Sequence, residues 1–380
     1  MGMVSSLLPF FIILSVGVLS SEIFRRFNLP YVLGLIFAGI IIGPVFNLLE
    51  VDSTIFLIGS IGLIFLMFMT GTEIKTENIK KFGKSIAIIS ILGGIIPFIA
   101  GFAIGRFFDY SILTSIFLGT CFISSSVAVV IPTLKKRKIM KTKIGQTIIS
   151  ATIFNDIASL LILALLLQSF ATKTIIPLPI YLPSLILILI GIKFIVTKIE
   201  KKYYSNKKGK DLFESELRFI FAVLIATVLL FEVIGMHAII AGFVIGIILS
   251  DSIRAKTEEK IHTISYGFFI PTFFIIVGME TDIFVFAHIN NILLALAIII
   301  SLITTKLASG YIGGRLTNFS KKDSLLIGAT SIPQLSTTLA AAYAGLTFGI
   351  IDQEIVSSLI MLSIVTIIIS PFLINRILNK

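Results

Sequence analysis

Residues 145–167 read GQTIISATIFNDIASLLILALLL. As a helix this stretch is long enough to cross the ~30 Å hydrocarbon core of a bilayer, which takes about 20 apolar residues. It holds one ionisable side chain, Asp156, near its middle and directly after Asn155. A charge at that depth is costly, so it marks either a functional site or a buried ion pair. The stretch therefore predicts a membrane helix built around an acid.

The whole chain has the composition of an all-α polytopic membrane protein. Of its 380 residues 56% are hydrophobic and 13% are charged, and the mean hydropathy is +1.08. Soluble domains are about a quarter charged, and a membrane β-barrel would need ~10-residue alternating segments that the sequence lacks. The first residues do not form a signal-peptide pattern, which predicts a retained helix. The single cysteine, Cys121, excludes an internal disulfide and a Cys-rich metal site.

Apolar runs of membrane-spanning length predict thirteen transmembrane helices. The predicted spans lie near residues 5–24, 30–47, 54–71, 84–107, 111–133, 144–170, 178–198, 213–232, 234–250, 261–280, 289–315, 323–346 and 352–375. Lysines and arginines collect in the loops after odd-numbered spans, the densest being KKRKIMKTK at 135–143. The positive-inside rule then places the N-terminus outside and the C-terminus in the cytoplasm of a multi-pass protein of the cell (inner) membrane. Because the basic residues are spread over short loops, they indicate topology and not nucleic-acid binding.

Two pairs of segments indicate an internal repeat. IFAGIIIGP at 36–44 resembles IIAGFVIGI at 239–247, and FMTGTEI at 68–74 resembles IIVGMET at 275–281. The aligned glycines are Gly39 with Gly242 and Gly71 with Gly278. The members of each pair are seven spans apart, so the two copies would have opposite orientations in the membrane.

This pattern predicts an inverted repeat of two six-helix units, an arrangement common in secondary transporters. The first unit would cover about 5–170 and the second about 213–375, with the helix at 178–198 as the linker, all within one transmembrane domain. Chance similarity between glycine-rich apolar helices is the alternative.

Spans five and twelve, which occupy corresponding positions in the two units, carry polar interruptions. Span five has Ser124, Ser125 and Ser126 in its middle, and span twelve has Pro333 and Gln334 within TSIPQLSTT. Proline removes a backbone donor and disfavours helix just before it. Unwound backbone at this depth persists only where it is packed or lines a wet cavity, so paired breaks indicate a transport site. Serine- and threonine-rich packing faces are the alternative.

The residues around the acid suit a hard monovalent cation, which prefers oxygen ligands. Asp156 would bind Na⁺, with Asn155 beside it in the ion- and proton-binding site. Hydroxyls and freed carbonyls at Ser125 and Ser126 would help, as would Thr152 one turn before Asp156 on the same face. Protonated Asp156 holds no cation, so one carboxylate can exchange a cation for a proton by competition. Lys306 is the second deep charge and is predicted to compensate this acid. A purely structural Asp–Lys pair that pins two helices is the alternative.

Several motifs occur in an order and spacing typical of one transporter group. They are LPYVLGLIFAGIIIGP (29–44), FMTGTEIKTENI (68–79), ISSSVAVVIPTLKKRK (123–138), Asn155–Asp156, FFIPTFFIIVGMETD (268–282) and Lys306 followed by Gly310. With these motifs the chain resembles, over nearly its whole length, the monovalent cation/proton antiporters of the Na⁺/H⁺ exchanger superfamily. The resemblance implies a homodimer, each protomer having a dimer domain and a core domain. It also implies crossed, partly unwound fifth and twelfth helices beside Asp156, and elevator-like alternating access.

The same resemblance implies exchange of Na⁺ or Li⁺ for H⁺, without a cofactor. Members with Asn-Asp at positions 155–156 tend to be electroneutral, whereas Lys306 and the SSSVAVV stretch look like the branch with two aspartates. Electroneutral exchange is therefore a hypothesis. A K⁺/H⁺ antiporter or K⁺ efflux protein is the alternative, and many such relatives carry a C-terminal nucleotide-binding domain, which is not expected here. A channel or a transport-deficient sensor also stays open. No motif for hydrolase, metalloprotease or phosphate-binding chemistry is present, so an enzyme is not expected.

Overall fold

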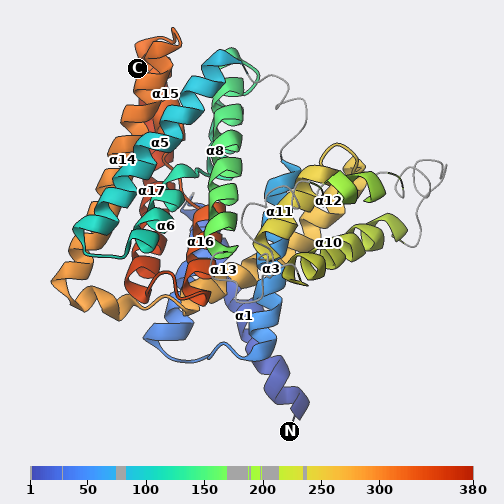
Figure 1. Cartoon of the computed structure of the whole chain (residues 1–380). Helices are drawn as coiled ribbons and strands as arrows, with labels where there is room; N and C mark the ends of the chain where they lie inside the picture. The colour runs from blue at the N-terminus through green and yellow to red at the C-terminus, as the bar shows by residue number, and fades with distance from the viewer. Residues whose placement is uncertain are drawn as a thin grey trace.

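A computed structural model describes most of the chain, namely residues 2–27, 29–73, 83–168, 187, 190–196, 198, 214–233 and 238–379. All regular secondary structure in these residues is helical. Figure 1 shows the two termini at opposite ends of the molecule. Seven of the described helices are long and apolar enough to span a membrane.

The helices, in chain order, are α1 (Gly2–Arg26), α2 (Tyr31–Ile40), the π-helix η1 (Ile41–Val45), α3 (Ser53–Thr72), α5 (Lys84–Phe107), α6 (Ile112–Ile123), α7 (Val127–Lys136), α8 (Lys143–Gln168), α10 (Ser215–Val233), α11 (Ala238–Leu249), α12 (Ala255–Ile264), the π-helix η2 (Ser265–Phe269), α13 (Ile270–Met279), the 3₁₀-helix η3 (Ile283–Ala287), α14 (Ile289–Leu316), α15 (Lys321–Thr330), α16 (Ser336–Thr347) and α17 (Gln353–Asn379). Every predicted span except the seventh coincides with helix. The seventh, at 178–198, falls mostly outside the described residues, so the prediction of thirteen helices stays a prediction.

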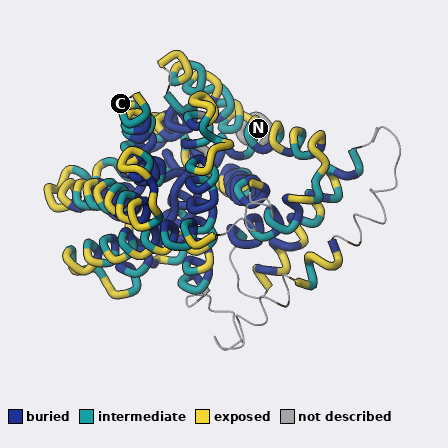
Figure 2. The backbone as a smooth tube through the Cα atoms, turned by 90° about the horizontal axis from the view of Figure 1, so that it is seen from above, coloured by how far each residue is buried: buried dark blue, intermediate teal, exposed yellow. Residues whose placement is uncertain are grey.

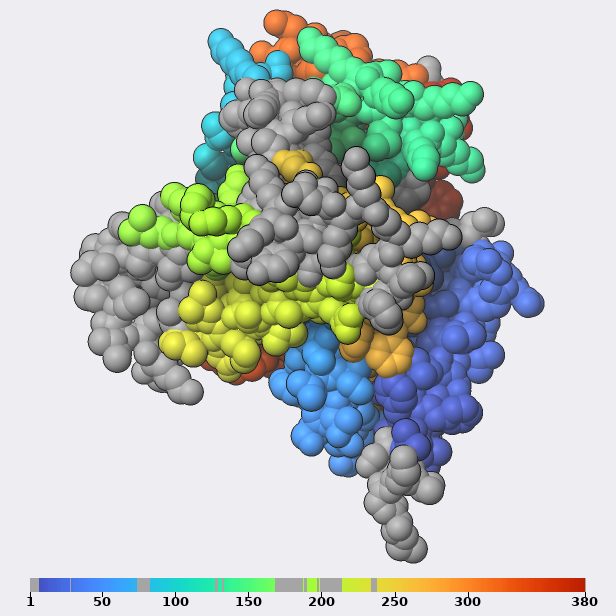
Figure 3. Space-filling view, turned by 90° about the vertical axis from the view of Figure 1, so that its right-hand side faces the viewer, coloured from blue at the N-terminus to red at the C-terminus, as the bar shows by residue number. Residues whose placement is uncertain are grey.

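The helices form two groups that lie side by side. One group, on the left of Figure 1, contains α5 to α8 and α14 to α17, which contact one another. The other contains α1 to α3 and α10 to α13. Figure 3 views the second group from the side of α10, with α10 and α11 in yellow-green and α1 in dark blue.

Apolar side chains cover the outside of the molecule as well as its interior. Figure 2 shows buried residues gathered at the centre and exposed ones on the outer helices. The exposed positions include large apolar side chains such as Phe11, Ile91 and Phe372. A perimeter of this kind suits hydrocarbon and not water.

Both predicted breaks are present, and they cross each other. The backbone leaves the helix at Ser124 to Ser126, between α6 and α7, and at residues 331–335, between α15 and α16. Ser126 N–H donates to the carbonyl of Pro333 at 2.7 Å, which joins the two unwound segments. Backbone groups that the breaks release from helical bonding thus find partners in each other, as burial requires.

Close glycine contacts relate the two halves of the second group. Helix α2 crosses α13 where a Cβ added to Gly39 would lie 2.9 Å from the Cα of Gly278. Helix α3 crosses α11 in the same way, with 2.9 Å between a Cβ on Gly71 and the Cα of Gly246. Gly39 and Gly246, like Gly71 and Gly278, are separated by 207 residues. The crossings therefore match Gly39 with Gly246, one helical turn beyond the Gly242 that sequence similarity suggested.

The first group contains an equally matched pair of crossings. A Cβ on Gly101 of α5 would lie 2.9 Å from the Cα of Gly119 in α6, and a Cβ on Gly310 of α14 would lie 2.3 Å from the Cα of Gly328 in α15. Both glycines of the second crossing follow their counterparts by 209 residues. The inverted repeat is supported by these four helix crossings, whose glycines are related by sequence separations of 207 or 209 residues. The outer bounds of the repeat stay a prediction.

Candidate functional site

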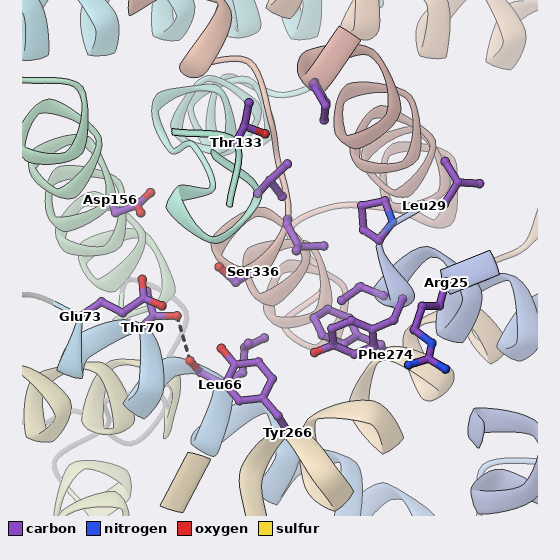
Figure 4. Close-up of a pocket in the computed structure, with 16 residues that line it drawn as sticks. Arg25, Leu29, Leu66, Thr70, Glu73, Thr133, Asp156, Tyr266, Phe274 and Ser336 are labelled. Atoms are coloured by element: carbon purple, nitrogen blue, oxygen red, sulfur yellow. Dashed lines mark hydrogen bonds between the residues drawn. The ribbon is translucent and has the colours of Figure 1, made fainter. Parts of the chain in front are cut away.

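A cavity of about 540 Å³ opens between the two helix groups and reaches Asp156. Figure 4 shows its lining side chains, which come from both groups. The first group contributes Thr133, Asp156 and Ser336, and the second contributes Thr70, Glu73 and Tyr266. A cavity between two bodies, with an acid at its deep end, has the form of a transport pathway.

Asp156 is held by the break in the helix that faces it. Its side chain is only 5% exposed, and its Oδ1 accepts the N–H of Ser125 at 3.1 Å. That N–H is available because the α6 helix ends at Ile123 and does not resume until Val127. The hydroxyls of Ser125 and Ser126 are buried and have no hydrogen-bond partner in the described residues. The carboxylate of Asp156 therefore contacts a short unwound segment that also carries two hydroxyls without hydrogen-bond partners.

The crossing itself is held by Gln334 and Ser124. Gln334 Nε2 donates to the carbonyl of Ser124 at 2.7 Å, and the Ser124 hydroxyl donates to Gln334 Oε1 at 3.1 Å. Gln334 N–H donates to the hydroxyl of Thr366 at 3.1 Å. All three predicted residues of the unwound segments, Ser124, Pro333 and Gln334, thus take part in the crossing. Thr366, on α17, is a member that sequence reasoning missed.

Lys306 lies in the same core but does not meet Asp156 directly. Its side chain is fully buried, and its Nζ donates to the carbonyl of Ile123 at 2.6 Å and to that of Gly93 at 3.4 Å. Among the described residues, no ion pair within 4.0 Å joins Lys306 to Asp156. Ile123 is the last residue of α6, where the helix dipole is negative. The ammonium therefore lies at the negative end of a broken helix, and the described residues contain no direct Asp156–Lys306 ion pair. That Lys306 compensates the charge of Asp156 stays a prediction.

Two other predicted residues face away from the cavity. Asn155 packs against α5, where a Cβ added to Gly93 would lie 3.1 Å from its Nδ2. Thr152 and Asn155 line a separate small pocket with Thr330 and Ser331. The structure therefore brings Asp156 and Ser125 into contact but does not place Thr152 on the same cavity.

Glu73 is the functional candidate whose position was least expected. The sequence places it near the end of a span, where a charged side chain could reach the membrane surface. In the structure it is exposed and lines the cavity together with Asp156. The periodicity of α3 carries a signal, since Leu66, Thr70 and Glu73 share one face and all line the cavity.

Comparison with known proteins identifies the family of this chain. Residues 10–380 match the family described as "Sodium/hydrogen exchanger, transmembrane". The chain is 30% identical to the "Probable Na(+)/H(+) antiporter 3" of Methanocaldococcus jannaschii, with 97% of this chain and 95% of that protein aligned. It is 29% identical to the "Na(+)/H(+)-K(+) antiporter GerN" of Bacillus cereus, over 93% and 91% of the two chains.

A solved structure shares the fold. The sodium proton antiporter MjNhaP1 of Methanocaldococcus jannaschii superposes with a TM-score of 0.72, covering 98% of this chain and 96% of that one at 18% identity. At this identity the likeness concerns the arrangement of helices. The family match, by contrast, covers nearly the whole sequence, including both breaks and Asp156. The chain belongs to the sodium/hydrogen exchanger family.

Proposed function

We propose that this chain is a secondary active antiporter that exchanges Na⁺, or Li⁺, for H⁺ across the cell membrane. The observation that carries the proposal is the contact of Asp156 with the unwound backbone at Ser125, at the deep end of the cavity. Family membership and the similarity to antiporters along the whole chain support it.

The exchange follows from the chemistry of one carboxylate. Ionised Asp156 and the hydroxyl oxygens of Ser125 and Ser126 offer the oxygen ligands that Na⁺ prefers. Protonation of Asp156 removes the negative charge that holds the cation, so proton and cation occupy the site alternately. Thr152 stays outside the proposed ion shell, because it lines a different pocket.

The proposed stoichiometry is one cation per proton. Asn155 adds no charge beside Asp156, and the Lys306 ammonium is bonded to the carbonyls of Ile123 and Gly93. In this arrangement only Asp156 changes its bound ion during the cycle. Each proton released is then replaced by one monovalent cation, and no net charge moves.

The proposed orientation places the N-terminus outside and the cavity mouth in the cytoplasm. Arg25 and Glu73, which line the cavity, precede loops that carry the basic residues of the positive-inside pattern. On the opposite side Tyr343 packs against Phe56 and Phe273, with ring centroids 6.4 and 6.0 Å apart. The two helix groups would therefore part on one face while they close on the other, as in elevator-like alternating access. Homodimerisation through the second group, and the repeat bounds 5–170 and 213–375, are parts of the same proposal.

K⁺ transport is the second candidate. It is favoured by the similarity to GerN, whose name includes both Na⁺ and K⁺. The neutral oxygens that the described residues leave unpartnered beside Asp156 are the hydroxyls of Ser125 and Ser126, and hydroxyl oxygens can bind K⁺ as well as Na⁺. Parallel assays with Na⁺, Li⁺ and K⁺ decide between the candidates.

The test uses everted vesicles, in which added Na⁺ dissipates a preformed pH gradient and restores the fluorescence of a quenched dye. Asp156→Asn is expected to abolish the response. Asp109→Asn is the matched control: Asp109 is exposed with a φ of 60°, and the corresponding position of the second repeat is naturally Asn318 with a φ of 63°. A cation flux without proton movement would instead indicate a channel.

Stoichiometry needs a separate measurement. Recordings on solid-supported membranes, driven by a pH gradient, are expected to show transport without a net current. A current that reverses with the pH gradient would contradict electroneutral exchange while leaving antiport itself intact.

A further inference from the structure

Glu73 is an acidic residue that the proposed exchange at Asp156 does not use. It follows α3 directly and lines the same cavity as Asp156. Figure 4 shows its carboxylate beside Thr70, on the side of the cavity where the Asp156 side chain projects. An ion that enters this cavity from solvent therefore meets Glu73 before it reaches the buried Asp156.

The inverted repeat gives Glu73 a counterpart. Glu280 follows α13 directly and is separated from Glu73 by 207 residues, the same separation that relates the glycine crossings. Helices α3 and α13 run antiparallel, since a Cβ on Gly59 would meet Ile276 and one on Gly62 would meet Phe273. The two acids therefore lie at opposite ends of this helix pair, one at each face of the membrane.

The surroundings of the two acids differ in the way an inward-open conformation requires. Glu73 is exposed on an open cavity, whereas Glu280 is only partly exposed. Tyr343 is packed between Phe56 and Phe273, with ring centroids 6.4 and 6.0 Å apart. Glu73 therefore faces an open cavity, whereas the rings of Phe56, Phe273 and Tyr343 pack together towards the opposite end of the α3–α13 pair, where Glu280 lies.

We infer that Glu73 and Glu280 are paired cation-capture residues, one for each face of the membrane. In the inward-open conformation Glu73 attracts the monovalent cation into the cavity that ends at Asp156, and in the outward-open conformation Glu280 does the same on the other side. The inference rests on the proposed antiport function and extends it to the route that the cation takes.

The physical basis is the field of a carboxylate inside a cleft with apolar walls. Such walls focus the field, so one fixed charge raises the local cation concentration more than it would on open surface. Besides the two acids Glu73 and Asp156, the cavity is lined by Arg25, which is paired with Glu22 at 2.7 Å, and this pairing offsets its repulsion of a cation. No hydrogen bond or ion pair to the carboxylate of Glu73 occurs within the described residues.

The test separates the two faces of the membrane. Glu73→Gln and Glu280→Gln are each assayed for Na⁺-driven proton movement in everted vesicles, where added Na⁺ meets the cytoplasmic face, and in right-side-out vesicles. Glu73→Gln is expected to raise the half-saturating Na⁺ concentration roughly tenfold in everted vesicles, with the maximal rate kept and right-side-out vesicles unaffected. Glu280→Gln is expected to show the reverse pattern.

Three controls make each outcome decisive. Glu259→Gln removes an equal charge from an exposed position of α12 outside the cavity. It should leave the half-saturating Na⁺ concentration unchanged in both kinds of vesicle. Glu73→Asp keeps the charge and should restore most of the affinity. Added choline chloride should reduce the difference in half-saturating Na⁺ concentration between wild type and Glu73→Gln, because salt screens the field of the carboxylate.

The failures of the two proposals are distinguishable. If the wild type moves no protons in response to Na⁺ or another monovalent cation, the antiport function fails. Suppose that the wild type responds but the two glutamine variants keep its half-saturating Na⁺ concentration, or raise that concentration equally in everted and right-side-out vesicles. Either result refutes the capture role while antiport stands.

Discussion

Replacing Lys306 with methionine is expected to loosen the end of α6 without making the exchange electrogenic. The 2.6 Å bond to the carbonyl of Ile123 has a charged donor, which is worth about 1.5–3 kcal/mol. The 3.4 Å contact with the carbonyl of Gly93 is long and adds less. Methionine also removes the cost of burying an ammonium, which offsets part of the loss. A net destabilisation of about 2 kcal/mol is therefore expected, concentrated at the break.

The sequence supplies a reporter for this assay. The chain has no tryptophan and a single cysteine, Cys121, which is 2% exposed and lies in α6 two residues before Ile123. A dye that fluoresces on reaction with a thiol therefore follows the opening of α6 as the purified protein is heated. Lys306→Met should lower the midpoint of labelling, Lys306→Gln should lower it less because an amide donor is kept, and Lys321→Met at an exposed position should leave it unchanged.

The same variants decide between a helix cap and a charge carrier. If Lys306 carries a proton through the cycle, its replacement changes the net charge moved on a supported membrane and need not change the labelling midpoint. A stable Lys306→Met protein with altered currents would refute the capping role.

Further outcomes follow from the same geometry. The half-saturating Na⁺ concentration in ²²Na⁺ uptake should fall about tenfold per pH unit while Asp156 is mainly protonated, and then level off; a flat profile would contradict competition at one carboxylate. Gly71→Leu should prevent accumulation of folded protein on size-exclusion chromatography, because a Cβ there lies 2.2 Å from a carbonyl of α11, whereas Gly267→Ala meets nothing within 4 Å and should behave as wild type. Tyr343→Ala should speed labelling of Glu280→Cys by an impermeant thiol reagent added outside, in a Cys121→Ser background; unchanged labelling would mean that Tyr343 does not close the outer face.

The sequence predicted the features that rest on local chemistry. Proline removes a helical donor wherever it stands, so the break at Pro333 follows from the residue itself. A serine run in the corresponding span predicted the second break, and the contact between Asp156 and Ser125 confirms that the acid faces it. Helix positions were predictable for a similar reason, since each spanning helix must satisfy its own backbone in lipid.

Features that depend on contacts between residues far apart in the sequence could not be predicted from it. Glycines one turn apart, such as Gly242 and Gly246, fit a repeat alignment equally well, and only the crossing with Gly71 distinguishes them. Lys306 binds backbone carbonyls, which every residue possesses, so no side-chain pattern could identify its partners. Thr152 shares a helical face with Asp156 by spacing, but the neighbouring helices divide that face between two cavities.

The two repeats carry equivalent backbone bonds at the crossing but different acceptors. Ser125 N–H donates to the carboxylate of Asp156 at 3.1 Å, and Gln334 N–H donates to the hydroxyl of Thr366 at the same distance. Two carboxylates facing one crossing would repel each other and could not both remain ionised without a further charge. Because a hydroxyl satisfies the second N–H without charge, a scaffold with twofold pseudosymmetry holds a single acid at its centre. The pseudosymmetry therefore suits the two proposed routes of access, one for each face of the membrane. The hydroxyl of Thr366, where an equivalent acid could stand, is consistent with the proposed single exchange site per protomer.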